Sequence, residues 1–338
     1  MNKTIEKALQ NRILILDGAM GTMLQRYNFS EEDFRGERFR DWKTSVKGNN
    51  DLLSLTQPKA IAAIHAKYFE AGADIVETNT FSGTTIAMAD YHMEDLVYEL
   101  NFESAKIAKK IAQEFTAKQP HKPRFVAGAM GPTNKTASMS PDVNDPGFRA
   151  ISFEELRIAY KQQAEALIDG GADLLLVETI FDTLNAKAAL FAIEEVKAER
   201  GITIPIMVSG TITDASGRTL SGQTAEAFLI SVSHIPLLSV GFNCALGAKQ
   251  LTPHLEIVAH RTNLAISAYP NAGLPNAFGE YDETPEQMAS QITEYLDKQL
   301  VNIIGGCCGT TPKHIKAIAK IANSYSPRPM DLKTPITV

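Results

Sequence analysis

Residues 169–183, DGGADLLLVETIFDT, contain the pattern that decides the fold. A glycine pair stops a helical pattern at residues 153–172, and the apolar run that follows ends in Glu178 and Thr179. A short apolar run bounded in this way predicts a strand that is buried on both faces of a parallel sheet. Residues 70–84, EAGADIVETNTFSGT, repeat the order of Gly-Ala-Asp, apolar run and Glu-Thr. The echo indicates repeated β/α units rather than two unrelated domains.

Outward from this pattern, eight such runs follow one another along the chain. They predict strands at residues 12–20, 73–81, 124–132, 172–180, 204–212, 237–245, 264–273 and 300–309. Most are separated by segments with helical spacing, including residues 58–73, 153–172 and 284–298. Eight β-then-α units are what a (β/α)8 TIM barrel requires, and a doubly wound open sheet is the alternative. We favour the barrel because the helices are evenly interspersed and no G-x-G-x-x-G follows the first strand.

The composition is that of a globular α/β protein. The chain has 338 residues, 44% of them hydrophobic, which fits one large barrel domain. We expect that domain to span residues 1–325, followed by a C-terminal extension or the start of a linker at residues 326–338. The net charge of -6 and the scattered basic residues argue against nucleic acid as a partner. The sequence shows no signal peptide and no apolar run long enough for a membrane span, so we expect a cytoplasmic location.

The carboxyl ends of the predicted strands are where a barrel builds its active site. Polar insertions at residues 26–57 and 133–151 should lie over that end. The candidate residues at the strand ends are Asp17, Gly18, Glu77, Thr78, Asn79, Glu178, Thr179, Asn243, Cys244, Asn271, Cys307 and Cys308. Barrel closure would bring the ends of the sixth and eighth strands close together. All three cysteines of the chain could therefore converge.

The cysteines allow three interpretations. A disulfide between Cys307 and Cys308 is disfavoured, because neighbouring Cα atoms lie about 3.8 Å apart, below the usual disulfide range. Packing is possible, because buried cysteine often behaves as a small hydrophobe. A metal explains all three together, since zinc accepts three sulfur ligands and leaves a fourth position open for chemistry. The seven histidines fall in predicted helices or loops, so none is an obvious fourth ligand.

A zinc ion with three thiolates is suited to holding one more thiolate. A free thiol has a pKa of about 8.5, and metal coordination deprotonates it. This chemistry points to alkylation of a substrate thiol. Asp17 and Glu178 could accept hydrogen bonds from an α-ammonium group, and backbone N–H groups around Gly18 could take a carboxylate. Glu77 and Asn79 either brace the loops, which we favour, or contact the substrate directly.

Several longer motifs resemble a known family. They are LDGAMGTMLQ, FRGERF, KGNNDLL, ETNTFSGTTIAMADY, GAMGPTNKTASMSPDVNDP, VETIFDTLNAKAA, SGTITDASGRTLSGQT, GFNCALG, YPNAGLPNAFGEYD and GGCCGTTPKHI. From about residue 10 to about residue 325 the chain resembles the homocysteine-binding module of cobalamin-dependent methionine synthases, within the homocysteine S-methyltransferase family. The resemblance implies a (β/α)8 barrel in which Cys244, Cys307 and Cys308 bind zinc and the zinc binds the sulfur of L-homocysteine.

The resemblance also implies roles for other residues and for partners. Asp17, Gly18 and Glu178 would hold the amino-acid end of homocysteine, and Asn271 would reach the zinc when substrate is absent. The methyl donor would be methylcobalamin, remethylated from methyltetrahydrofolate. Complete methionine synthases continue into folate and cobalamin modules, so we expect these modules to be absent or on a separate chain. Two alternatives stay open, namely a stand-alone enzyme that uses S-methylmethionine or betaine, and a non-catalytic module with structural zinc.

Overall fold

Eight parallel strands form one sheet in the computed structural model, which describes residues 2–214 and 216–331. The strands are β1 (Leu14–Ile15), β2 (Ile75–Glu77), β3 (Phe125–Met130), β4 (Leu174–Ile180), β5 (Ile206–Gly210), β6 (Ser239–Gly247), β7 (Ala265–Asn271) and β8 (Ile303–Ile304). From β2 to β8 each strand pairs with the next one in sequence, and β1 pairs with β8. A parallel bridge between Leu16 and Ile75 completes the circle. The predicted TIM barrel is therefore confirmed, and the doubly wound sheet is excluded.

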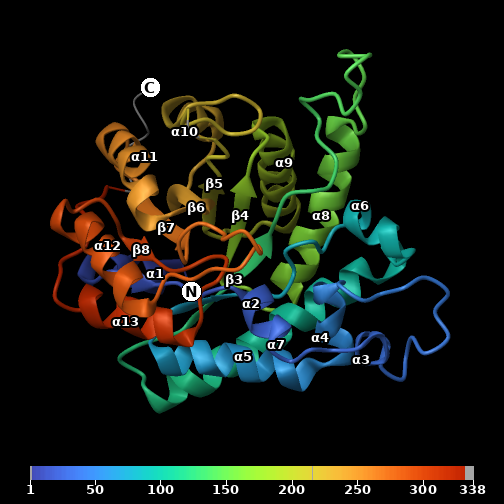
Figure 1. The fold of residues 1–338 in the computed structure, drawn as a ribbon, viewed down its shortest axis with the longest axis horizontal. Coiled ribbons are helices and arrows are strands. Elements are labelled where there is room, and N and C mark those ends of the chain that lie inside the picture. Colours follow the sequence, from blue (N-terminus) through green and yellow to red (C-terminus); the bar gives the residue numbers. More distant parts are fainter. Residues whose placement is uncertain (1, 215, 332–338) are drawn as a thin grey trace.

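Most of the long helices surround the barrel on its outside (Figure 1). The helices are α1 (Asn2–Asn11), α2 (Met20–Gln25), α3 (Glu31–Arg35), α4 (Leu53–Thr56), α5 (Pro58–Ala71), α6 (Thr85–Met88), α7 (Val97–Lys118), α8 (Phe153–Asp169), α9 (Thr183–Arg200), α10 (Ala225–Val232), α11 (Ala248–Arg261), α12 (Pro285–Asp297) and α13 (Pro312–Ala322), with short 3-10 turns at Asn50–Leu52, Ala89–Tyr91 and Glu94–Leu96. The predicted helices at residues 58–73, 153–172 and 284–298 match α5, α8 and α12 to within a few residues. Among the described helices, none is long and apolar enough to cross a membrane. The cytoplasmic location stays a prediction.

The first and last strands are much shorter than predicted. The runs at residues 12–20 and 300–309 form ladders only at Leu14–Ile15 and Ile303–Ile304. Beyond the ladders the two segments turn toward each other, and the Gly306 N–H donates a hydrogen bond to the Asp17 carbonyl (3.1 Å). Glycine allows this approach, because a Cβ on Gly305 would lie 2.7 Å from the Leu16 Cβ. Apolar periodicity marks both segments as buried, and it does not mark where the ladder ends.

The repeated Gly-Ala-Asp has a structural basis. Asp74 and Asp173 stand just before β2 and β4, and each carboxylate accepts a hydrogen bond from a backbone N–H on the preceding strand: Ile15 (2.9 Å) and Val126 (3.0 Å) respectively. Both also pair with cations. Arg12 lies 2.6 Å from the Asp74 carboxylate, and Lys109 lies 2.5 Å from that of Asp173. These charge-assisted bonds join neighbouring strands at the amino-terminal end of the barrel, which leaves the carboxyl end free for the site.

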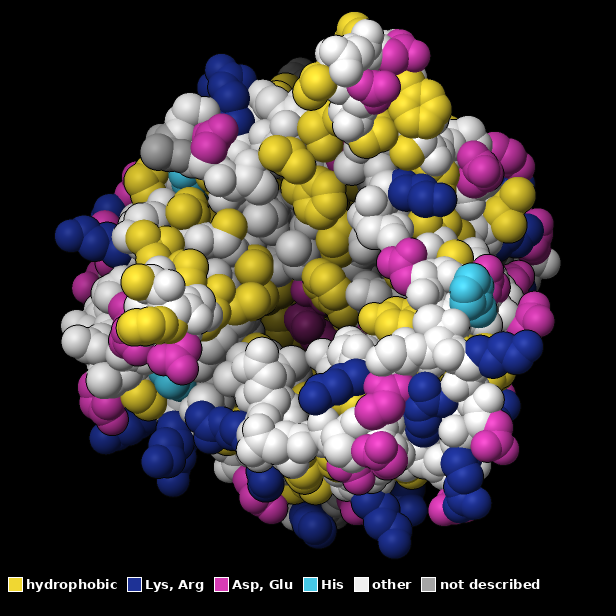
Figure 2. Space-filling view, turned by 45° about the vertical axis from the view of Figure 1, so that its right-hand side comes forward, with side chains coloured by type: hydrophobic (Ala, Val, Ile, Leu, Met, Phe, Trp, Pro, Cys, Tyr) yellow, Lys and Arg dark blue, Asp and Glu magenta, His cyan; other side chains and the backbone are white. Residues whose placement is uncertain are grey.

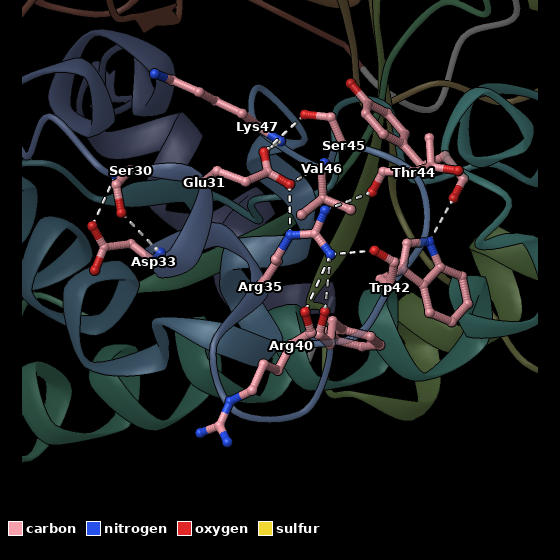
Figure 3. A network of polar contacts seen from close by, with 12 residues as sticks. Ser30, Glu31, Asp33, Arg35, Arg40, Trp42, Thr44, Ser45, Val46 and Lys47 are labelled. Carbon is pink, nitrogen blue, oxygen red and sulfur yellow. Dashed lines mark hydrogen bonds and ion pairs between the residues drawn. The ribbon is translucent and has the colours of Figure 1, made fainter.

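The predicted insertion at residues 26–57 is folded rather than irregular. Helix α3 begins with a capping box at Ser30, and the Glu31 carboxylate accepts bonds from the Val46 N–H (3.0 Å), the Lys47 N–H (2.8 Å) and the Ser45 hydroxyl (2.8 Å). Arg35 bonds to Glu31 (2.8 Å) and to backbone carbonyls of the same segment (Figure 3). The Glu31–Arg35 pair thereby organises the segment that leads to the site wall near Asn50.

The predicted C-terminal extension is described only in part, because residues 332–338 lie outside the described residues. The Arg328 guanidinium donates hydrogen bonds to the carbonyls of Leu264 (3.0 Å) and Ala259 (2.5 Å), and the Asp331 N–H donates to the Asn263 carbonyl (2.9 Å). The chain after α13 therefore returns to the start of β7. The division between domain and extension at residue 325 stays a prediction.

The close contact between β6 and β7 at Gly241 gives a test of the fold. A Cβ on Gly241 in β6 would lie 1.7 Å from the Ser267 carbonyl oxygen in β7. We expect Gly241→Ala to lower the free energy of unfolding by about 3 kcal/mol, because two paired strands must separate. Gly21→Ala is the control, since nothing lies within 4 Å of its Cβ and it sits in helix α2. Denaturant titration of both variants measures the difference, and equal midpoints would contradict the β6–β7 packing.

Candidate active site at the carboxyl end of the barrel

The three cysteines converge at the carboxyl end of the barrel. Their sulfur atoms all lie within 4.8 Å of one another, and the Cys244 and Cys308 sulfurs are 3.7 Å apart. Cys244 comes from β6, and Cys307 and Cys308 follow β8. Closure of the sheet is what unites segments so distant in sequence. The convergence that the strand ends predicted is therefore present.

Local backbone turns aim the sulfurs at one point. Cys244 and Ala245 have φ angles of 60° and 55°, and the β6–β7 register shifts between Asn243 and Gly247. After β8 the ladder has ended, so Cys307 and Cys308 both line the same cavity rather than opposite faces of a strand. Left-handed backbone at non-glycine residues is costly and persists only where the surroundings enforce it. The cysteine cluster is such a place.

Asn243 supplies part of that enforcement. Its side-chain oxygen accepts hydrogen bonds from the Thr179 N–H (3.1 Å) and the Ser209 hydroxyl (2.7 Å), and its amide nitrogen donates to the Thr179 hydroxyl (2.8 Å). The same nitrogen lies 3.8 Å from the Cys307 sulfur. Thr179 itself has a φ of 54°. One buried amide thus fixes the Glu178-Thr179 turn and touches the cysteine cluster.

A cavity of about 820 Å³ opens above the cysteines. Its described lining includes Asp17, Gly18, Glu77, Asn79 and Glu178 from the predicted set, together with all three cysteines. Among the described residues, the lining contains six acidic residues and one basic residue, Arg26. Figure 2 shows acidic side chains in the depth of the hollowed face and hydrophobic side chains around much of its edge. A cavity with this lining is suited to a small ligand that carries positive charge.

Three buried carboxyl groups, those of Asp17, Glu77 and Glu178, lie together in the cavity lining. Burial raises the pKa of Asp17, and the nearby Glu77 carboxylate raises it further. Burial raises the pKa of Glu77 to about 8 and that of Glu178 well above its usual range, with Glu77 and Asp17 adding to the latter. Burial disfavours the charged forms of these carboxyl groups, as does mutual repulsion for Asp17 and Glu178, and an entering ammonium group would stabilise the carboxylate form. The site thus has a sulfur-rich end and a cation-binding end.

The other predicted residues lie at the same mouth with different partners. The Asn79 amide donates to the Asn50 carbonyl (2.8 Å) and the Ser54 hydroxyl (3.2 Å), which favours the bracing role. The Asn271 oxygen accepts from the Cys308 N–H (3.1 Å), and its nitrogen lies 3.5 Å from the Tyr281 hydroxyl. Asn271 therefore supports the cysteine backbone in this structure. Its role as a metal ligand stays a prediction.

Sequence analysis assigned no role to several lining or supporting residues. Asp51 in KGNNDLL is buried in the cavity wall, where its carboxylate accepts a bond from the Ser82 N–H (3.0 Å). Tyr281 lies on the segment between β7 and α12, and Thr310 follows the cysteines. Asn243 was among the strand-end candidates, but its contacts with Thr179 and Ser209 could not be read from the sequence. Asp51 and Tyr281 are on loops, where periodicity gives no signal.

The donor set of the cluster fits a soft metal ion. Within the described ranges, the group of side chains placed to hold a metal ion consists of the three cysteines, and no histidine joins them. Hydrogen bonds from Cys244 and Cys307 lower the pKa of Cys308 to about 3, so the cluster accommodates a thiolate. Thiolate ligands select zinc and similar ions over hard cations, and three protein ligands leave a position open.

Comparison with known proteins now decides the family. Residues 14–322 match the family model described as homocysteine S-methyltransferase. The chain belongs to this family. Among solved structures, the metallated form of the homocysteine methyltransferase MmuM from Escherichia coli is similar, with a TM-score of 0.70 and 24% identity over 92% of this chain and 97% of that one. The apo form of the same protein gives a TM-score of 0.64 and 24% identity over 92% and 96% of the chains. At this identity the two structures support the fold.

Membership of the homocysteine S-methyltransferase family makes the chain a methyltransferase, as the thiol chemistry of the cluster indicated. The family match includes every predicted site residue, since all of them lie between Asp17 and Cys308. The individual roles of these residues, and the choice of methyl donor, go beyond the match.

Metal content tests the cluster directly. We expect about one Zn²⁺ per purified chain, and almost none after Cys307→Ser, because two thiols and a hydroxyl hold zinc far more weakly. Inductively coupled plasma mass spectrometry measures this content. His121→Gln, which changes an exposed histidine outside the cluster, should keep the full amount. Zinc retained by Cys307→Ser would show that the metal sits elsewhere.

Asp51 gives the site a measurable pH dependence. Burial raises its pKa from 3.8 to about 7, so the folded protein binds a proton that the unfolded chain releases. Stability from this group is present below about pH 4 and is lost as pH rises toward 7. We expect Asp51→Asn to remove this part of the decline, on the order of 2–4 kcal/mol across the window.

Denaturant titrations between pH 4 and pH 8 measure the effect of Asp51→Asn. The amide can still accept the Ser82 N–H bond, so the change isolates the proton equilibrium. Asp41→Asn, at an exposed position, is the control and should follow the wild-type curve. Parallel curves for wild type and Asp51→Asn would show that the Asp51 carboxyl is solvated.

Proposed function

We propose that this chain binds L-homocysteine, converts its thiol to a thiolate on zinc, and presents that thiolate for methylation to L-methionine. The observation that carries the proposal is the meeting, in one cavity, of a three-thiol cluster and a buried carboxyl cluster. Homocysteine has a thiol at one end and an ammonium group at the other. The two ends of the cavity match the two ends of this substrate.

Cys244, Cys307 and Cys308 would hold the zinc ion, which supplies charge that keeps the substrate sulfur deprotonated at neutral pH. The thiol proton leaves to solvent or to a cavity carboxylate when the substrate binds. Glu178 and Asp17 would accept hydrogen bonds from the ammonium group, and the backbone at Gly18 would meet the carboxylate. Glu77 and Asn79 would hold these groups in place. The sulfur then bonds to the methyl carbon, and the electron pair of the broken bond leaves with the donor.

The donor that we propose is methylcobalamin, carried with the folate-binding function on other modules or on a separate chain. The support is the set of motifs FRGERF, SPDVNDP and DASGRTLSGQT, which resemble cobalamin-dependent methionine synthases in particular. Hydrophobic side chains around the cavity mouth fit a large partner that approaches from outside. We propose a cytoplasmic location on the same reasoning as before.

A second candidate is a stand-alone homocysteine methyltransferase that uses a small donor such as S-methylmethionine or betaine. The observation that favours it is the acidic lining of the cavity, because both donors carry a positive charge. The two candidates share the acceptor thiol and differ only in the donor.

A donor comparison tests the proposal. The zinc-loaded chain is incubated with L-homocysteine and, separately, methylcobalamin, S-methylmethionine or betaine, and methionine is measured by mass spectrometry. We expect methionine with methylcobalamin, and a loss of at least about a hundredfold for Cys308→Ser, because the bound thiol would no longer be deprotonated. His121→Gln should keep wild-type turnover.

Other outcomes of the same experiment discriminate between the candidates. Turnover with S-methylmethionine or betaine, and none with methylcobalamin, would replace the first candidate by the second. Methylation by the zinc-free chain at the wild-type rate would reject zinc activation altogether. An X-ray absorption spectrum that stays unchanged when homocysteine is added would indicate a purely structural zinc.

A further inference from the structure

Two loops that hold different halves of the site are hydrogen-bonded to each other. We call residues 17–22, which follow β1 and include the first residues of α2, the first loop, and residues 305–310, after β8, the cysteine loop. The Thr310 hydroxyl donates to the Cys307 carbonyl (2.6 Å) and accepts from the Ala19 N–H (3.2 Å). The hydroxyl group thus donates its proton to the cysteine loop and accepts a hydrogen bond from the first loop. Thr310 is fully buried, so water does not compete for these bonds.

Further hydrogen bonds join the first loop to the cysteine loop. The Gly306 N–H donates to the Asp17 carbonyl (3.1 Å), and the Gly309 N–H donates to the Thr22 hydroxyl (3.1 Å). From helix α5, the Tyr68 hydroxyl lies 3.2 Å from the Ala19 carbonyl and 3.5 Å from that of Thr310. The two loops therefore share a continuous set of bonds that runs from the cysteines to the Asp17-Gly18 turn.

The Thr310 side chain is tightly packed between the two loops. A Cβ on Gly18 would lie 2.7 Å from the Thr310 hydroxyl oxygen, and one on Gly306 would lie 2.5 Å from the Thr310 methyl carbon. Glycines on both loops thus fit around a single threonine side chain. Because interiors pack densely, a shift of Cys307 is passed to Thr310 and then to Ala19.

We propose that Thr310 is a positioning residue that couples metal binding at the cysteines to binding of the amino-acid end of the substrate at the first loop. Metal binding fixes Cys307, Cys307 fixes the Thr310 hydroxyl, and the hydroxyl fixes the first-loop backbone. A loop that is already ordered loses less entropy when a ligand binds. Coupling of this kind is reciprocal, so ligand binding would also tighten metal binding. The inference rests on the proposed function for the placement of the amino-acid end.

The test uses L-norvaline, an isostere of homocysteine whose methyl group replaces the thiol, so that it cannot bind zinc. Isothermal titration calorimetry measures its affinity with zinc-loaded and zinc-free protein. For wild type we expect zinc to tighten norvaline binding about fivefold or more, which is the usual size of coupling between sites. We call the norvaline affinity of the zinc-loaded protein divided by that of the zinc-free protein the affinity ratio. For Thr310→Val this ratio should fall below about twofold, while one zinc per chain is retained.

Matched variants separate coupling from simple loss of structure. Thr310→Ser keeps the hydroxyl and should restore the wild-type ratio. Thr252→Val removes a buried threonine hydroxyl that bonds to the Ala248 carbonyl in α11, outside the site, and should leave the ratio unchanged. If Thr310→Val does not fold, Thr22→Val is the second variant, because it removes the acceptor for the Gly309 N–H. It should also lower the ratio of norvaline affinities with and without zinc.

The outcomes are distinct from those of the proposed function. A norvaline affinity in wild type that does not change with zinc would overturn the coupling, and so would a wild-type ratio in Thr310→Val. Zinc-loaded protein that binds homocysteine and never norvaline would also overturn it, because all binding would then come from the sulfur. Protein that binds neither amino acid would reject the proposed function itself.

Discussion

Closure of the barrel between β8, β1 and β2 is the constraint on which the rest of the structure depends. Two ladder pairs, Leu14 with Ile303 and Ile15 with Ile304, and one bridge from Leu16 to Ile75 complete the circle. Parallel strands in a closed sheet must end on the same rim. Because the first and last strands are adjacent there, the first loop and the cysteine loop meet. The candidate site exists because of that adjacency.

The site concentrates features that oppose stability. Three carboxyl groups are buried in one cavity beside three thiols, and burial with mutual repulsion holds the carboxyl pKa values high. Thr179, Cys244 and Ala245 adopt left-handed backbone that only glycine adopts readily. Such costs persist where a substrate or a metal relieves them. Here a cation at the carboxyl cluster and a soft metal at the thiols would each supply that relief.

Support for these strained groups comes from neutral polar side chains. Asn243 fixes the turn at Thr179, Asn271 holds the Cys308 N–H, and Thr310 joins the two loops. Amide and hydroxyl groups suit this task, because each can donate and accept at once without adding charge to an already acidic cavity. The ion pairs of Asp74 and Asp173 lie at the opposite end of the barrel. These two ion pairs therefore lie away from the buried carboxyl groups of the cavity.

The sequence by itself determined the barrel, its eight strand positions and the rim at which the cysteines and acidic residues gather. Burial of both sheet faces makes strands apolar, and polar residues or cysteines at the ends of six of the predicted strands mark the rim. Only the tertiary structure decided how short β1 and β8 are, how Cys244 turns, and that Thr310 bonds to Ala19, 291 residues away in the chain. These features depend on contacts between distant segments, and local periodicity carries no information about such contacts until the barrel has closed.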